Sequence, residues 1–185
     1  LLKKNLSSRP HDPNLHFNKG YLYYPLDKLE LALTSYLEVV RLDPEYPYIN
    51  NNIALLYENY IKDYQKALAY YTKEIKLNPP YAVAYRNRAD LYASQLQDLD
   101  KALEDYNKAV SVDPKNSINY EKRGNFYSDY LNDYDKALED YNEGIALNPT
   151  DPDLHFSKGY LYHVYLDKPD LALKGYLEVV KLYPN

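Results

Sequence analysis

Apolar and polar residues alternate along this chain with the period of an α-helix. Ala137, Tyr141 and Ile145 follow one another at steps of four residues, so they share one helix face, and mainly charged or amide side chains fill the positions between them. A second segment of the same kind lies just upstream. The pattern predicts one helix over about Ser117–Leu131 and another over about Asp133–Leu147, which together form a helical hairpin.

This hairpin pattern occurs five times. Prolines recur every 35 residues after a first interval of 34. Ten residues after a proline stands a small residue, and a tyrosine follows three residues later, as at Gly124 and Tyr127. A fixed period of this length is the signature of a repeat protein made of stacked units. The prolines are Pro10, Pro44, Pro79, Pro114, Pro149 and Pro184.

Residues at the expected helix ends agree with this division. An aspartate stands where the second helix of a hairpin, helix B, needs a side-chain acceptor at its N-terminus. A proline lies near the first turn of the first helix, helix A, where its missing N–H costs nothing. No β-type alternation occurs, so the predicted fold is all-α. The aspartates are Asp63, Asp98 and Asp133, and the prolines are Pro13, Pro47 and Pro152.

The hairpin resembles the tetratricopeptide repeat, through Gly124, Tyr127, Ala137, Tyr141 and Pro149 and their equivalents over residues 10–184. The resemblance implies a right-handed superhelical α-solenoid of antiparallel helix-turn-helix repeats, whose concave groove is lined mainly by A helices. It also implies a protein–protein interaction scaffold that binds a peptide segment of a partner protein in that groove. Four repeats depart from the family by an extra residue between helices A and B, and the family's early aromatic position in helix A is here filled by His16, Asn50, Tyr85, Tyr120 and His155.

The domain organisation is expected to be a single array over residues 10–185, with repeats at 10–43, 44–78, 79–113, 114–148 and 149–183. Residues 1–9 align with the last turns of a preceding helix B and place Leu2 and Leu6 in its apolar columns. The last repeat is followed by no polar capping helix. We therefore expect a segment of a longer array, or a self-assembling module whose ends pair with another copy as a homo-oligomer.

The resemblance also assigns groove positions in helix A. Counted from each repeat's proline, the position at seven residues holds Phe17, Asn51, Arg86, Glu121 and Phe156. The position at eight holds Asn18, Asn52, Asn87, Lys122 and Ser157. The position at eleven holds Tyr21, Leu55, Asp90, Asn125 and Tyr160.

These columns suggest how a peptide is held. An amide side chain offers both a donor and an acceptor, so Asn18, Asn52 and Asn87 could form a ladder against an extended backbone. The alternative is that these asparagines are solvated or bond neighbouring helices. The groove is aromatic at both ends and of mixed charge in its middle, and its aromatic residues are either peptide anchors or packing between repeats.

Two further features bear on the groove and its surroundings. The lysine- and asparagine-rich set with which co-chaperone tetratricopeptide domains hold a partner's C-terminal carboxylates is absent, because only Asn52 fits it. Glu74 occupies a helix B column that otherwise holds small or β-branched residues. Because burying an unpaired carboxylate is costly, Glu74 is expected to reach solvent, paired with Lys76 or the next repeat.

Composition narrows the function classes. The net charge is −5, which opposes a nucleic-acid groove and with it the reading of the 35-residue period as a pentatricopeptide, RNA-binding array. No cysteine, no phosphate-binding glycine loop and no apolar run of membrane-spanning length occurs. His16 and His155 share a packing column, and Asp151 with His155 supplies too few ligands for a metal. We expect no enzyme, no cofactor, no nucleic-acid or membrane partner, and the cytoplasm as the default compartment.

Overall fold

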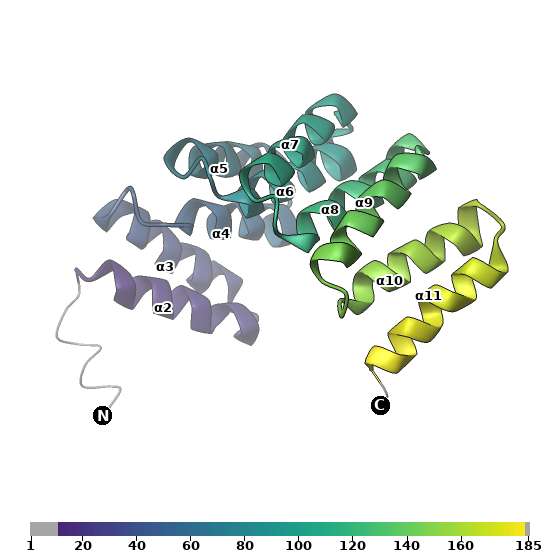
Figure 1. The fold of residues 1–185 in the computed structure, drawn as a ribbon. Coiled ribbons are helices and arrows are strands. Elements are labelled where there is room, and N and C mark those ends of the chain that lie inside the picture. The colour runs from purple at the N-terminus through teal and green to yellow at the C-terminus, as the bar shows by residue number, and fades with distance from the viewer. Residues whose placement is uncertain (1–10, 184–185) are drawn as a thin grey trace. The chain divides into compact units, whose positions relative to one another are not determined.

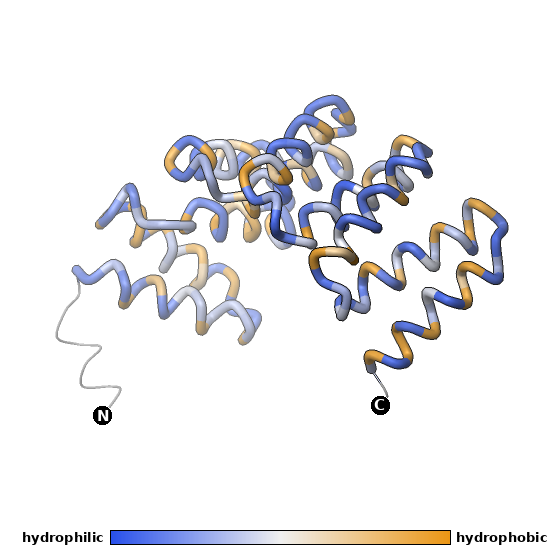
Figure 2. Tube along the Cα trace, viewed as in Figure 1, coloured by the Kyte–Doolittle hydropathy of each residue, from blue (hydrophilic) through white to orange (hydrophobic). Residues whose placement is uncertain are grey.

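The computed structural model describes residues 11–183, and within that range every regular element is a helix. The predicted remnant at residues 1–9, with Leu2 and Leu6, lies outside the described residues. The protein divides into two compact units, residues 1–80 and 81–185, which are treated separately below. Apolar residues recur at short intervals along each helix and form no long run (Figure 2).

Helices A and B of each repeat lie against each other as antiparallel hairpins, for example α8 and α9 in Figure 1. The first unit contains α2 (Pro13–Tyr23), α3 (Leu29–Leu42), α4 (Ile49–Leu56) and α5 (Tyr64–Leu77). The second unit contains α6 (Ala82–Leu91), α7 (Leu99–Val112), α8 (Ser117–Phe126), α9 (Tyr134–Leu147), α10 (Pro152–Tyr160) and α11 (Pro169–Leu182). The predicted all-α fold of stacked helical hairpins is confirmed.

The extra residue of repeats two to five is absorbed where helix A ends. In the second repeat, helix A continues from α4 into a π-helical turn, Tyr57–Ile61, and the Asp63 N–H donates to the Tyr57 carbonyl at 3.0 Å, six residues back. The first repeat ends helix A in a 3₁₀ turn instead, and the Lys28 N–H reaches the Tyr23 carbonyl at 3.1 Å, five residues back. The wider turn therefore accommodates the additional residue between helices A and B.

Small residues of helix A lie under a tyrosine of helix B. A Cβ atom added to Gly124 would stand 2.7 Å from Cε1 of Tyr141, and one added to Gly20 would overlap the ring of Tyr36. The equivalent position in the second repeat is Ala54, which is fully buried. The small-residue column is thus explained by the close approach of the ring that each helix B contributes.

The predicted N-caps of the B helices are confirmed. The side chains of Asp63, Asp98 and Asp133 accept hydrogen bonds from the backbone N–H three residues on. Pro13 and Pro152 occupy the first turns of α2 and α10, whereas α4 begins two residues after Pro47.

The interpretation of Glu74 as a solvent-reaching residue was wrong. Its side chain has no solvent exposure, and its carboxylate accepts from the backbone N–H of Tyr48 (3.2 Å), Asn50 (3.1 Å) and Asn51 (3.4 Å) and from the Asn78 side-chain amide. Glu74 on α5 therefore caps the N-terminus of α4, whose own cap residue, Tyr48, is left-handed (φ 63°) and makes no capping bond through its side chain. Four donors satisfy the buried charge, which removes the need to reach solvent.

The buried side chain of Asn50, on α4, contrasts with that of Glu74 because its hydrogen-bonding groups are not satisfied within residues 11–183. It is fully buried, and neither its side-chain oxygen nor its side-chain nitrogen has a partner among the described residues. In the fourth repeat, the same column holds Tyr120, whose hydroxyl donates to the Pro114 carbonyl at 3.1 Å. An unsatisfied buried amide costs on the order of 1–3 kcal/mol, so α4 carries a local penalty beside its carboxylate cap.

Candidate functional site

The first unit contains a hollow of about 300 Å³ between its two A helices, which we call the aromatic hollow. Four of the predicted groove residues line it, from both repeats. Its walls are aromatic, and a single amide faces it. The lining residues are Phe17, Tyr21, Tyr24, Tyr36, Asn52 and Leu55.

Ring contacts fix most of this wall. Phe17 packs on Tyr36 with ring centroids 5.9 Å apart, and the Tyr60 hydroxyl donates to that of Tyr24 at 3.0 Å. Burial raises the pKa of Tyr36 to about 12, because the phenolate would be poorly solvated in this environment. Tyr21 differs from its neighbours because 66% of its surface is exposed. The lining thus includes the buried ring of Tyr36 and two exposed rings, Tyr21 and Tyr24 (39%), of which Tyr21 is the more accessible.

The second unit contains a related hollow of about 190 Å³ between helices A of the fourth and fifth repeats. Counted along the repeat, its residues occupy the columns of the aromatic hollow: Asn125 matches Tyr21, Tyr141 matches Tyr36, and Tyr160 matches Leu55. Asp129 adds a carboxylate, which accepts from the Ser128 hydroxyl at 2.7 Å. The same repeat geometry therefore forms two hollows with different chemistry. The remaining lining residues are Phe156, Ser157, Leu161 and Tyr165.

Polar side chains at eleven residues from the proline are held by tyrosines of helix B. The Tyr141 hydroxyl donates to Oδ1 of Asn125 at 2.7 Å, and the Tyr106 hydroxyl donates to Asp90. Burial raises the pKa of Tyr141, because it disfavours the charged phenolate. These bonds fix the orientation of Asn125 and Asp90.

The other predicted positions have mixed environments. Asn51 is only 3% exposed, so it offers no surface to a ligand. Arg86 donates to the Asn119 side chain on the next helix A. Burial raises the pKa of Glu121, with Asp153 and Asp151 adding to the effect. Asn18 and Phe156 are exposed, whereas Asn87 and Lys122 are partly buried.

Helix B tyrosines are the part of the hollows that the groove assignment omitted. Tyr36 and Tyr141 are not among the groove positions that the resemblance assigned, and they line the aromatic hollow and its relative. Their recurrence eight residues before each proline was visible in the sequence. The structure shows that these rings, although buried, form part of the lining of each hollow.

A metal site or a membrane-spanning helix would indicate another kind of function. Within residues 11–183, no group of three or more histidine and acidic side chains could hold a metal ion. No helix there has both the length and the apolar character to cross a bilayer.

Comparisons with known proteins agree on one fold. A family model described as TPR repeat matches residues 20–59 and 130–163, and a model described as Tetratricopeptide repeat matches 47–81 and 82–116. No curated protein matches the sequence.

Solved structures give the same result at low identity. TTC0263, a TPR protein of Thermus thermophilus, is 21% identical with a TM-score of 0.75 over 94% of this chain and 93% of its own. A MamA fragment of Desulfovibrio magneticus RS-1 is 21% identical, with a TM-score of 0.71 and 93% and 95% coverage. YrrB, described as a TPR protein with an unusual peptide-binding site, is 17% identical, with a TM-score of 0.64 and 99% and 92% coverage.

Proposed function

Because the chain belongs to the tetratricopeptide repeat family, a family of protein-interaction scaffolds, we propose that it binds a peptide segment of a partner protein, with the aromatic hollow as the principal anchor. The observation that carries this proposal is that Phe17, Tyr21 and Asn52 line one hollow together. The fold is generally a non-enzymatic scaffold. The peptide-binding site described for YrrB is a precedent on a similar fold.

The chemistry of the hollow suggests what such a segment contributes. An apolar side chain entering it would lie against Phe17 and Leu55 and displace water from their surface. The Asn52 amide could then bond the N–H and C=O of the peptide backbone, because it carries a donor and an acceptor. Tyr21 could close over the bound side chain from its exposed position at the rim.

Tyr21→Ala is expected to weaken the binding of peptides selected from an array by about tenfold, because an aromatic anchor is removed from a hot-spot position. Affinity would be measured by fluorescence anisotropy with the 185-residue chain. Leu22→Ala is the matched control: Leu22 is adjacent on α2 and 61% exposed, and it does not line the hollow. Peptides that respond to Leu22→Ala and not to Tyr21→Ala would contradict the proposal.

A second candidate function is self-association through α11. On α9, Leu138 and Ile145 pack against the apolar cluster that includes Leu154 of α10. Their equivalents on α11, Leu173 and Val180, are 56% and 63% exposed. A second copy of this protein could cover this face in a symmetric pair of α11 helices, since twofold dimers with self-complementary patches are the commonest oligomers.

If this second candidate holds, light scattering coupled to size exclusion should show a mass that rises from that of a monomer towards that of a dimer as concentration increases. Leu177→Glu should return the mass to that of a monomer, because Leu177 is 57% exposed on the same face and a charge there opposes burial. A monomeric mass at every concentration would exclude self-association by this face.

A further inference from the structure

Repeats three and four each contain a largely buried ion pair between their own helices A and B. Arg88 on α6 holds Asp105 on α7 through Nε (2.7 Å) and Nη2 (2.8 Å). Arg123 on α8 holds Asp140 on α9 in the same two-pronged way, at 2.8 and 2.7 Å. Both carboxylate side chains are 6% exposed. The scaffold therefore places a carboxylate against a cation at this point of the hairpin.

The fifth repeat keeps the cation and loses the carboxylate. Nine residues after its proline stands Lys158, and the position equivalent to Asp140 is Gly175. Lys158 Nζ donates to Oδ1 of Asn142 on α9 at 2.6 Å, and within residues 11–183 it makes no ion pair. Burial lowers the pKa of Lys158, as expected for an ammonium withdrawn from water without a counter-charge.

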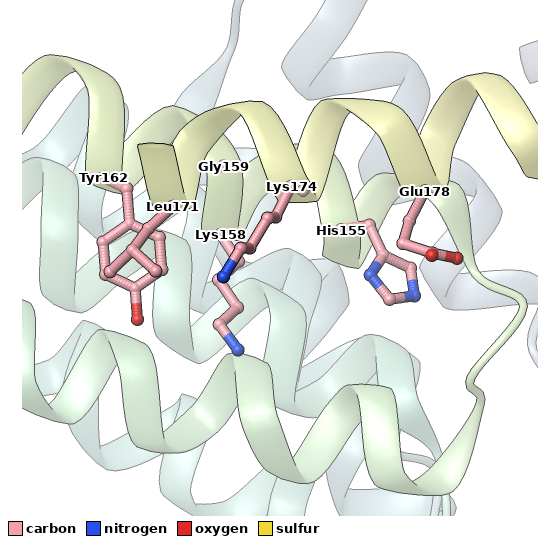
Figure 3. A pocket seen from close by; sticks show the side chains of 8 residues that line it. His155, Lys158, Gly159, Tyr162, Leu171, Lys174 and Glu178 are labelled. Atoms are coloured by element: carbon pink, nitrogen blue, oxygen red, sulfur yellow. The ribbon is translucent and has the colours of Figure 1, made fainter. Parts of the chain in front are cut away.

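A pocket of about 220 Å³ lies at this position, between α10 and α11. Figure 3 shows the side chains of Lys158 and Lys174 in its middle, Tyr162 with Leu171 at one end, and His155 with Glu178 at the other. The Glu178 carboxylate is engaged by Lys181 on its own helix at 3.2 Å. The pocket thus presents two ammonium groups beside a position that holds a carboxylate in the two preceding repeats.

Gly175 itself leaves no room for a side chain that would fill this place. A Cβ atom there would stand 2.9 Å from the His155 carbonyl oxygen and 3.0 Å from the Gly159 Cα, both of which are backbone atoms of α10. The close approach of the two helices therefore excludes a side chain at this position. In the first repeat, the same position holds Ser35, whose hydroxyl donates to the Leu31 carbonyl at 2.7 Å. Glu178 is the acidic residue that lines the pocket, and its carboxylate pairs with Lys181, so the described residues of this hairpin give Lys158 no ion-pair partner.

We propose that this pocket, which we call the lysine pocket, binds a carboxylate supplied by a partner protein, with Lys158 as its main contact and Lys174 as a second cation. The carboxylate takes the role that Asp105 and Asp140 have in the preceding repeats. An aspartate or glutamate side chain and the free C-terminus of a polypeptide offer the same chemistry. The site is separate from the two hollows, because it shares no residue with them.

Three short alanine-based peptides test this proposal on the 185-residue chain. One carries an internal aspartate and an amidated end, one has a free C-terminal carboxylate, and one has neither. In two-dimensional NMR titrations, one or both carboxylate peptides should shift the amide signals of Gly159 and Gly175, and the neutral peptide should leave them in place. The peptide that binds identifies the source of the carboxylate.

Variants of the lysine separate a specific contact from general attraction. Lys158→Gln should weaken carboxylate binding by about tenfold, because a charge-assisted bond is lost, and Lys158→Arg should retain it. Lys108→Gln is the control for one lost positive charge, since Lys108 is exposed on α7 and distant in sequence from the pocket. An equal loss in Lys108→Gln, no carboxylate-dependent shift at Gly159 and Gly175, or tighter binding of inorganic phosphate than of either carboxylate peptide would overturn the proposal.

Discussion

Glu74→Ala is expected to destabilise the first unit by about 3 kcal/mol, because three backbone N–H groups at the start of α4 lose a buried, charged acceptor. The loss should exceed that of an ordinary N-cap, which is about 1 kcal/mol, since the Glu74 side chain is fully buried and also accepts from Asn78. Urea unfolding of the 185-residue chain would measure this loss of stability. Hydrogen exchange would locate it, because the amides of Asn50 and Asn51 should lose protection first.

Two further variants serve as controls for this prediction. Glu74→Gln keeps one acceptor oxygen and should lie between the wild type and the alanine variant. Glu104→Ala, at an exposed position on α7, should change stability by less than about 0.5 kcal/mol. A Glu74→Ala protein as stable as the wild type, with unchanged exchange at Asn50, would show that the carboxylate does not cap α4.

The hairpins themselves follow from local rules that repeat five times. The predicted helix A over Ser117–Leu131 corresponds to α8 with its π-helical turn, and the predicted helix B corresponds to α9 with Asp133 as its cap. These boundaries depend on caps, prolines and small residues that act within a few positions of one another. Such determinants are readable in one sequence, and their agreement in five copies removes the usual ambiguity.

Glu74 shows where this reasoning fails. Its column is defined by the repeat, and a small residue is expected there, but the carboxylate acts on an N-terminus that lies more than twenty residues away in the sequence. The feature that could have predicted this role lies on α4. Its N-cap residue is a tyrosine that makes no side-chain capping bond, whereas α8 has Asn116 as a capping residue. In this repeat, the buried carboxylate on α5 takes the place of the side-chain cap that α4 lacks. The two groups meet only because the helices pack against each other.

The candidate site was predictable to a similar degree. The columns taken from the family resemblance include Phe17, Tyr21 and Asn52, which lie together in one hollow, and also Asn51, which is buried. Adjacent positions on one helix differ in this way because a shift of one residue turns a side chain by about 100°. Which of two neighbours faces the hollow depends on how α2 and α4 pack, and the sequence pattern alone does not fix that rotation.

Asp140→Ala is expected to be the most damaging of the substitutions considered, with a loss of about 3–5 kcal/mol. It removes the acceptor of both bonds from Arg123 to Asp140 and leaves the guanidinium partly buried, near the Asn107 side-chain oxygen at 2.9 Å and the Tyr120 ring, whose centroid is 5.9 Å away. An uncompensated buried charge costs more than the pair contributes. Urea unfolding followed by the amides of α8 and α9 would measure this loss.

A double variant separates the cost of leaving one charge unpaired from the contribution of the ion pair itself. Arg123→Met with Asp140→Leu removes both charges and keeps apolar volume, so its stability should lie close to that of the wild type. The exposed pair of Lys136 and Asp133, at 2.6 Å, is the control, because Lys136 is 56% exposed and Lys136→Ala should cost less than about 1 kcal/mol. If the double variant were as unstable as Asp140→Ala, the ion pair would itself hold the hairpin together, and the comparison with the fifth repeat would change accordingly. The fifth repeat has Lys158 and Gly175 in these positions and still forms the hairpin of α10 and α11, which indicates that a hairpin of this kind can form without the pair.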